Sequence, residues 1–489
     1  MAGGKAPFRF RRSVFEDACR KIYGDGGMDD SMMQSPEVTA LIEETFRIIS
    51  SAVDRGLTED VPAELHYALE NNAFIFSGFK AYHSLMEAGL SMIGSDGRVK
   101  PFSAFLQDVR AINARYNENW LRAEYNHALA SAQMAAKWSS LEKNPDRYML
   151  QYRTARDTRV REEHAALDGI TLPADDPFWD RYYPPNGWNC RCNAVQVRRA
   201  KYTSSDPEKA MKLGNEATEG PKKAIFRFNA GRTMQIFPPK HPYYKAPEKA
   251  GDTIMAMNRT LVSSDDIVGV INTSKEMRSW FERGFSKIGI ETNPDNNAST
   301  DMRGQIFITK DRLANVISAV NKLRSGQNLS KNEADAMSTF WHEITHNRHK
   351  GSLPALTPTE RKYMELANEY VARKTLPEFY RAWGAEVPYP ELMDNRESVA
   401  YNAGVRNYNV LVNKTGADAA GVFEYIKEKL FNGDYSKQLD YLVGALEKNG
   451  ARKKDGTKFK KSEIRNIVVK CGKYGEGAFS DLVDLLIEH

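Results

Sequence analysis

The feature that most restricts the fold is a long helical pattern in the N-terminal third of the chain. From residue 36 to about residue 145, apolar residues recur at a spacing near 3.6, helix breakers are few, and Ala, Glu and Leu are common. The pattern predicts amphipathic helices, and 101–141 fits either one long helix or two. At ~100–200 residues per domain, the 489 residues leave room for about two to four domains, so further units are expected.

The character of the sequence changes at Tyr148. Gly, Pro and aromatic residues become frequent up to about residue 195, and the run NAVQVR predicts a short strand. A polar, Lys-rich segment follows to about residue 224. The next run, KAIFRFNAGRTMQIFPPKHPYY, predicts two short strands that end at a Pro-rich stop. These changes place a domain boundary near residue 246.

A second α+β region is expected after this boundary, with strands at 287–291 (KIGIE) and 304–310 (GQIFITK) followed by helices. The predicted class is therefore α+β: a mainly helical N-terminal domain with a small β-containing knuckle, and then an α+β domain. The expected bounds are 1–245 and 246–440 for these two domains, and 441–489 for a basic helical C-terminal extension.

The composition argues against several classes of protein. A net charge of only +5 does not give the strong overall positive potential that attracts nucleic acid. Four cysteines are too few for a disulfide scaffold and fit a reducing compartment. No apolar run approaches the ~18 residues of a membrane span, and the basic N-terminus lacks the apolar core of a secretory signal.

The sharpest local motif is H-E-x-x-H, in the run Trp341-His342-Glu343-Ile344-Thr345-His346. On a helix, residues four apart share a face, so His342 and His346 can reach one ion. Ser330 and Glu333 form a capping box that predicts such a helix. Four apolar residues fall on the opposite, buried arc: Met337, Phe340, Trp341 and Ile344.

A zinc site of this kind needs a third protein ligand, and a second helix is expected to supply it. Thr357 and Glu360 form another capping box, with Pro358 at the favoured first helical position. This helix carries Glu365 and Glu369 one turn apart on one face.

These helices resemble those of the gluzincins, the thermolysin-like metallopeptidases, in which a downstream glutamate, often preceded by Asn, binds zinc. The resemblance implies Zn²⁺ held by His342, His346 and Glu369, since Asn368-Glu369 matches the pattern. Glu365 is the reserve ligand and Glu397 a more distant alternative. The resemblance further implies that Glu343 is the general base in peptide-bond hydrolysis.

Three further residues are candidates for stabilising an oxyanion in such a reaction: His349, Tyr363 and Tyr370. His349 and Ser352 stand where metzincins have Gly and a third His, so that subfamily is disfavoured. Two alternatives remain open, namely an intact but catalytically idle site and a solvated helix face.

Residues 148–197 closely resemble the Mu F-like minor head proteins of tailed phages, and the resemblance extends over roughly 1–245. The residues that carry it follow the order of the family pattern: Arg156-Asp157, Arg159, Arg161, His164, Asp168-Gly169, Pro184-Pro185, Gly187-Trp188 and Cys190-Arg191-Cys192. The resemblance implies a role in head morphogenesis at a few copies per capsid, with portal and capsid proteins as partners. It implies location in the virion, in the host cytoplasm during assembly, and delivery into the host with the DNA.

Within this segment, Cys190 and Cys192 would point to the same side of a strand. With His164 they form either part of a second metal site or a compact structural knuckle. Asp157 and Asp168 are candidates for a fourth ligand.

The resulting hypothesis is a phage minor head protein that carries a zinc-dependent peptidase or effector domain acting on a protein or peptide. One alternative is a purely structural virion protein with an idle zincin-like domain, and another is a prohead maturation protease. The basic run at 448–473 fits contact with phage DNA or a membrane surface, or simply a solvated face.

Overall fold

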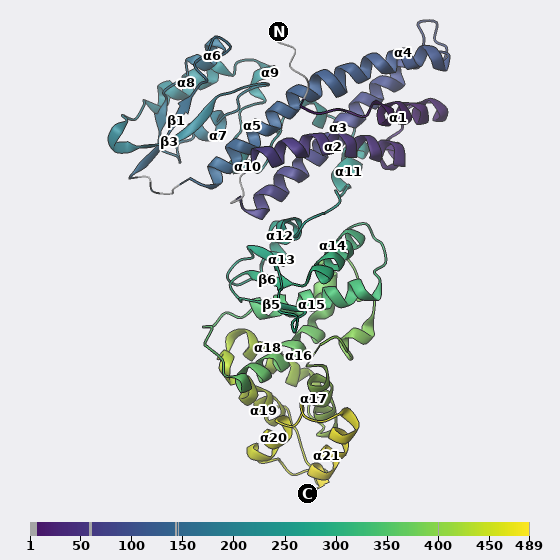
Figure 1. Cartoon of the computed structure of the whole chain (residues 1–489), viewed down its shortest axis with the longest axis vertical. Coiled ribbons are helices and arrows are strands. Elements are labelled where there is room, and N and C mark those ends of the chain that lie inside the picture. The colour runs from purple at the N-terminus through teal and green to yellow at the C-terminus, as the bar shows by residue number, and fades with distance from the viewer. Residues whose placement is uncertain (1–6, 58–60, 142–143, 145, 400, 489) are drawn as a thin grey trace. The chain divides into compact units, whose positions relative to one another are not determined.

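The computed structural model describes residues 7–57, 61–141, 144, 146–399 and 401–488, and divides into two compact units, Met1–Arg259 and Thr260–His489. Helices dominate both units, and each contains one small three-stranded sheet (Figure 1). The predicted mainly helical α+β class is therefore confirmed.

Unit 1 is built on a helical layer, which the periodicity of residues 36–145 predicted from α2 onwards; α1 and η1 lie before the predicted region. Its elements are α1 (Arg12–Asp25), η1 (Asp30–Gln34), α2 (Pro36–Gly56), α3 (Ala63–Ser91), α4 (Phe102–Asn113), the π-helix η2 (Ala114–Trp120) and α5 (Leu121–Ser139). Ser35 caps α2, and Pro36 occupies its first turn. Because α4, η2 and α5 follow one another without a break, residues 102–139 form one long helix with a π-helical segment, which decides between the one helix and the two that the sequence allowed for 101–141.

A small antiparallel sheet with strand order β2-β1-β3 follows the helical layer. Its strands are β1 (Tyr148–Arg153), β2 (Thr171–Leu172) and β3 (Asn193–Arg198), and the last matches the predicted strand NAVQVR. Short helices lie between or after its strands: α6 (Glu162–Ala165), α7 (Phe178–Tyr182), η3 (Arg199–Lys201) and α8 (Pro207–Ala217). Residues of α7 and α8 share a hydrophobic core with the sheet. The aromatic side chains of α7 are fully buried beside this sheet, so they form core.

The two strands predicted between residues 223 and 244 are wrong. That segment contains α9 (Pro221–Ala224), α10 (Ala230–Thr233) and η4 (Pro242–Tyr244). Asn229 accepts hydrogen bonds from two backbone amides of α10 and so caps a helical turn. The Phe237 ring stacks on Phe76 of α3 at 3.6 Å, which buries the apolar residues of the segment against helices instead of in a sheet.

The division between the units falls at Arg259, whereas the sequence placed it near residue 246. The difference is α11 (Glu248–Ala256), which packs on α3 and η1. Ile254 of this helix is buried in the core of unit 1, and it lies so close to Gly78 that a Cβ at that position would sit 2.7 Å from its side chain.

Unit 2 begins with α12 (Ser264–Thr273) and α13 (Lys275–Arg278), followed by a sheet of order β4-β6-β5. The parallel pair β4 (Lys287–Ile290) and β6 (Gln305–Ile308) falls within the strands predicted from sequence. The edge strand β5 (Ala298–Thr300), antiparallel to β6, was not predicted. Three helices follow: α14 (Lys310–Arg324), α15 (Lys331–Asn347) and α16 (Pro358–Ala382).

The C-terminal helices pack on α16 in a single hydrophobic core. Those that contact α16 directly are η5 (Pro390–Met393), α17 (Asn402–Lys414), α18 (Ala419–Asn432), η6 (Tyr435–Lys437) and α19 (Gln438–Lys448). The last two helices join the same core through their neighbours: α20 (Lys461–Val468) packs on α19, and α21 (Glu476–Glu488) packs on α17. The helices within residues 441–488 therefore share a core with the preceding helices and do not form a separate extension. Several cations of the basic run form ion pairs within unit 2: Lys453 with Glu463, Lys454 with Glu488, and Arg465 with Asp440.

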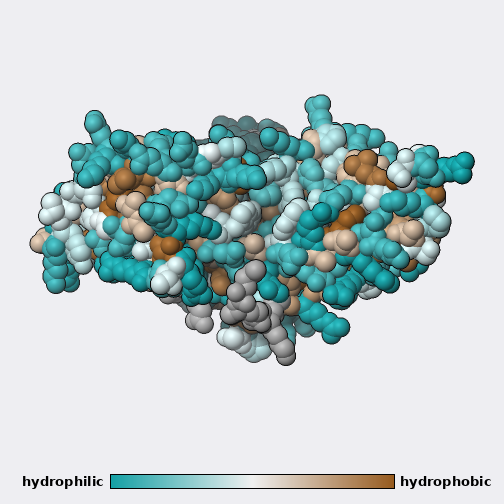
Figure 2. Space-filling model, turned by 90° about the horizontal axis from the view of Figure 1, so that it is seen from above, coloured by the Kyte–Doolittle hydropathy of each residue, from teal (hydrophilic) through white to brown (hydrophobic). Residues whose placement is uncertain are grey.

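On the face shown in Figure 2, hydrophilic residues predominate and apolar ones form small scattered patches. Within the described part of the chain, no helix combines the length and apolar character needed to cross a membrane.

Candidate metal centre

Helices α15 and α16 of unit 2 carry the H-E-x-x-H motif and the downstream glutamates. Both begin at the predicted capping boxes, Ser330 with Glu333 and Thr357 with Glu360. The predicted back face of α15 is buried, and the Trp341 ring stacks on that of Phe379 at 4.8 Å. This packing fixes one helix against the other.

Three side-chain atoms converge on the opposite face of α15. The Nε2 atoms of His342 and His346 lie 3.1 Å apart, and Oε2 of Glu365 lies 3.2 Å from the first and 3.3 Å from the second. Zinc bonds of about 2.0–2.2 Å at tetrahedral angles separate ligand atoms by roughly 3.3–3.5 Å. The three atoms are therefore close to the spacing that one zinc ion requires.

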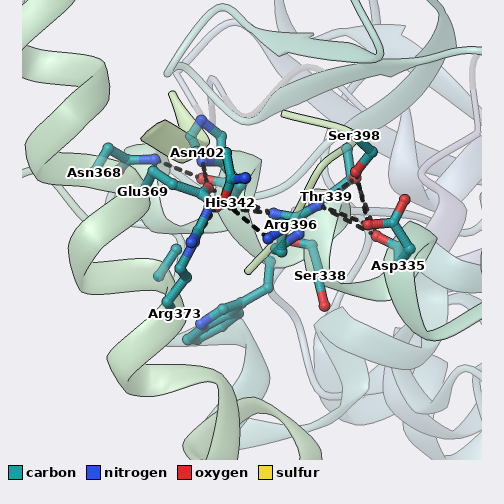
Figure 3. A network of polar contacts seen from close by, with 12 residues as sticks. Asp335, Ser338, Thr339, His342, Asn368, Glu369, Arg373, Arg396, Ser398 and Asn402 are labelled. Atoms are coloured by element: carbon teal, nitrogen blue, oxygen red, sulfur yellow. Dashed lines mark hydrogen bonds and ion pairs between the residues drawn. The ribbon is translucent and has the colours of Figure 1, made fainter. Parts of the chain in front are cut away.

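Glu369, which the sequence favoured as the third ligand, lies behind this cluster. One of its oxygens accepts a 2.6 Å hydrogen bond from Nδ1 of His342. The other accepts a 2.7 Å bond from Arg373, and Arg396 approaches both (Figure 3). Burial raises the pKa of Glu369, but these cations and His342 outweigh it and hold the pKa below its usual range. The other alternative, Glu397, is solvent-exposed.

Each of the two histidine rings is oriented by a contact at its Nδ1 atom. Nδ1 of His342 bonds to Glu369, and Nδ1 of His346 lies 2.7 Å from the hydroxyl of Tyr435. Hydrogen bonds of this kind fix the ring orientation and tautomer of metal-binding histidines. They leave both Nε2 atoms turned towards Glu365.

The cluster lines a cavity of about 480 Å³ in unit 2. Strand β5, the segment 353–356 and Tyr401 form much of the rest of its wall, and Glu343 lines it beside the two histidines. Burial raises the pKa of Glu343 above its ordinary value. Burial and the nearby Glu365 carboxylate raise the pKa of Tyr401 to about 12.

Tyr401 could not be identified from the sequence, because it lies in a loop far along the chain from the H-E-x-x-H motif and belongs to no recognisable pattern. The residues that the sequence suggested for oxyanion stabilisation lie elsewhere. His349 is buried, with its ring nitrogens 2.8 Å from the Leu430 carbonyl oxygen and 3.2 Å from that of Ser352. Tyr363 and Tyr370 belong to the hydrophobic core of the C-terminal helices.

Unit 1 contains a second cluster of ligand-type side chains, formed by His164, Cys190 and Cys192, as the sequence suggested. Their ligand atoms lie within 4.8 Å of one another. Asp157 and Asp168 are engaged instead by Arg191 and Arg156.

Comparison with known proteins finds a family resemblance within unit 1. Residues 98–195 match the family described as "Phage Mu protein F like protein", so this segment of the chain is Mu F-like. The match covers α4, the π-helical segment, α5, β1, β2, the thiol-containing loop that carries Cys190 and Cys192, and the first half of β3.

Two curated relatives are similar to the chain. The "Mu-like prophage FluMu F protein" of Haemophilus influenzae is 30% identical over 166 residues, 32% of this chain and 39% of the relative. The "Putative capsid assembly protein F" of Escherichia phage Mu is 31% identical over 183 residues, 34% of this chain and 42% of the relative. The chain thus spans about two fifths of the length of these relatives. No solved structure matches the chain at a significant level.

Proposed function

We propose that this chain takes part in phage capsid assembly and that its second unit is a zinc-dependent peptidase. The capsid role rests on the Mu F-like segment and on the name of the phage Mu relative. Its partners would be capsid and portal proteins, with phage DNA nearby, and its location the virion. The peptidase role rests on the geometry of unit 2.

The donor set of unit 2 fits zinc. Two imidazole nitrogens and one carboxylate oxygen match the chemistry of catalytic zinc sites, which keep one position open. Glu369 and Tyr435 supply the outer hydrogen bonds that such histidines require. A bound zinc ion would polarise a substrate carbonyl and lower the pKa of water.

The residues around the ligands fit peptide hydrolysis. Glu343 follows His342 in the motif and lines the same cavity, so its carboxylate can take a proton from the attacking water and deliver it to the leaving amine. The high pKa of Tyr401 keeps its hydroxyl protonated at neutral pH, so it can donate to the developing oxyanion.

The substrate class follows from β5. This strand pairs with β6 along one edge, and Ala298, Ser299 and Thr300 line the cavity. An edge strand beside a reacting centre can pair with an extended peptide through main-chain hydrogen bonds. A protein or peptide segment is therefore favoured over a small metabolite.

The observation that carries the peptidase proposal is the convergence of His342, His346 and Glu365 beside Glu343. Metal analysis of the full-length protein tests it first. Glu365→Gln should remove the zinc bound by unit 2, whereas Glu360→Gln on the same helix, which keeps a capping side chain, should retain it. Equal zinc content in both variants would contradict the proposed ligand set.

Catalysis is tested separately with Glu343→Gln, which keeps every ligand. Host cells that express the wild-type chain should contain cleaved peptides that are missing with the variant, although both proteins bind zinc. Identical peptide profiles with full zinc occupancy would favour an idle site in a structural virion protein. Cleavage confined to phage capsid proteins would identify a maturation protease.

A further inference from the structure

The thiol-containing loop before β3 lies against α6 in unit 1. The Nδ1 atom of His164 on α6 is 3.6 Å from Sγ of Cys190 and 3.6 Å from Sγ of Cys192. His164 and Cys190 are buried, and Cys192 is partly buried. Three ligand-type atoms from two separate segments therefore meet in one place.

The spacing matches that of a metal site. Zinc–sulfur bonds of about 2.3 Å and zinc–nitrogen bonds of about 2.0–2.1 Å, at tetrahedral angles, separate sulfur from nitrogen by roughly 3.6 Å. The two distances from Nδ1 of His164 to the cysteine sulfurs both have this value. A pair of thiolates with an imidazole is also the ligand chemistry that zinc prefers in structural sites.

The neighbouring carboxylates do not complete the set. Asp157 accepts two 2.6 Å hydrogen bonds from Arg191, and Asp168 accepts hydrogen bonds from Thr154 and Arg156. The three ligands instead line a cavity of about 310 Å³. A fourth ligand can reach the site from this cavity.

We infer that unit 1 holds a zinc ion through Nδ1 of His164 and the Sγ atoms of Cys190 and Cys192, with solvent as the fourth ligand. The ion links α6 to the loop that leads into β3, and so ties two parts of the small sheet domain together. The inference is independent of the peptidase proposal, because it concerns a different unit and a different ligand chemistry.

Cobalt substitution separates this site from the one in unit 2. Cobalt(II) bound to thiolates gives a ligand-to-metal charge-transfer absorption that nitrogen and oxygen ligands do not give. The full-length protein loaded with cobalt should show this band, and Cys190→Ser or His164→Ala should weaken or abolish it. Cys19→Ser, at a buried thiol of α1, should leave it unchanged. The Glu365→Gln variant should keep the band, so failure of the peptidase proposal would not remove it.

A second measurement avoids substitutions that could prevent folding. In the unmodified protein, bound zinc should protect Cys190 and Cys192 from alkylation, and a chelator should expose both within a folded chain. Mass spectrometry reports each thiol, with Cys471 as a buried control. Absence of the cobalt band from the folded protein would overturn the inference. So would alkylation that is equally fast with and without zinc, or a Cys190–Cys192 disulfide in protein purified under reducing conditions.

Discussion

The Nδ1 atom of His342 lies 2.6 Å from Oε2 of Glu369. Because its carboxylate is engaged by this contact, Glu369 does not join the cluster formed by Glu365 and the Nε2 atoms of His342 and His346. Glu369 is fully buried, and Arg373 and Arg396 both contact its carboxylate. Held in this way, it accepts the Nδ1 proton and directs the opposite nitrogen of His342 towards Glu365. The two glutamates of one helical face thus have different roles.

The first prediction follows from this difference. Glu369→Gln should bind zinc roughly 10–100-fold more weakly than wild type, because the oriented hydrogen bond to His342 is weakened while the three ligands remain. Glu365→Gln should lose more affinity, since a ligand itself is removed. Competition with a chromogenic chelator measures both, with a circular dichroism melt to verify folding. A larger loss for Glu369→Gln than for Glu365→Gln would reverse the assignment.

A second prediction concerns proteolysis. The link between α11, which belongs to unit 1, and α12 of unit 2 spans residues 257–263. Few contacts cross such a boundary, so limited proteolysis should cut there first and leave two stable fragments. Mass spectrometry of the early fragments locates the cut. Early cleavage within 230–250, where Phe237 and Ile236 are buried in the core, would contradict this division of the chain.

The sequence predicts the local features of the site but not the choice between its glutamates. A capping box involves residues three apart, so the starts of α15 and α16 can be read without tertiary information. Glu365 and Glu369 share one face, and sequence spacing alone cannot separate them. What separates them is Arg396, which reaches Glu369 from a loop 27 residues further along the chain.

The same reasoning applies to the fold. The apolar spacing of residues 36–145 is enough to predict helices, because a spacing near 3.6 that repeats over many turns fits an amphipathic helix and not a strand. The aromatic run at 223–244 lacks such a repeat, and its conformation is decided by the helices that bury Phe237. Strand β5 is too short for its three residues to show alternation, and pairing with β6 defines it.

A third prediction concerns the buried ion pair of unit 1. Nζ of Lys80 lies 2.6 Å from Oε2 of Glu124 and 2.7 Å from the carbonyl oxygen of Tyr116 in the π-helix, and both charged side chains are almost completely buried. Lys80→Met should lower the free energy of unfolding by ~3–5 kcal/mol, because the Glu124 charge is left without its partner.

Urea denaturation measures this loss, and the double variant Lys80→Met/Glu124→Leu should recover much of it. Arg115→Ala removes a solvent-exposed ion pair with Glu87 and should cost ~1 kcal/mol or less. The single variant Glu124→Leu completes the comparison. If the double variant lost as much free energy of unfolding as the two single variants lose together, the loss would come from packing rather than from the unpaired charge.

The fourth prediction concerns pH. Burial raises the pKa of Glu70 to about 7 from its ordinary 4.5. Asp54 raises the pKa further, whereas the hydrogen bond with Ser50 and the charges of Arg259 and His66 lower it without cancelling the effect of burial. Oε1 of Glu70 is buried without a hydrogen-bond partner among the described residues, which disfavours the charged form. Between pH 4.5 and 7 the folded state therefore binds more protons at this site than the unfolded state does.

Stability from this group is fully present below pH 4.5 and is lost as the pH rises through about 7. By pH 8 the loss should approach, at most, ~3 kcal/mol. Glu70→Gln stays neutral at every pH, so it should stabilise the chain at pH 8 and have little effect at pH 4.5. Glu43→Gln, at an exposed position of α2, provides the control. Urea unfolding of wild type and both variants at the two pH values measures the difference. If the stability of Glu70→Gln relative to wild type were the same at both pH values, Glu70 would ionise normally in the folded protein.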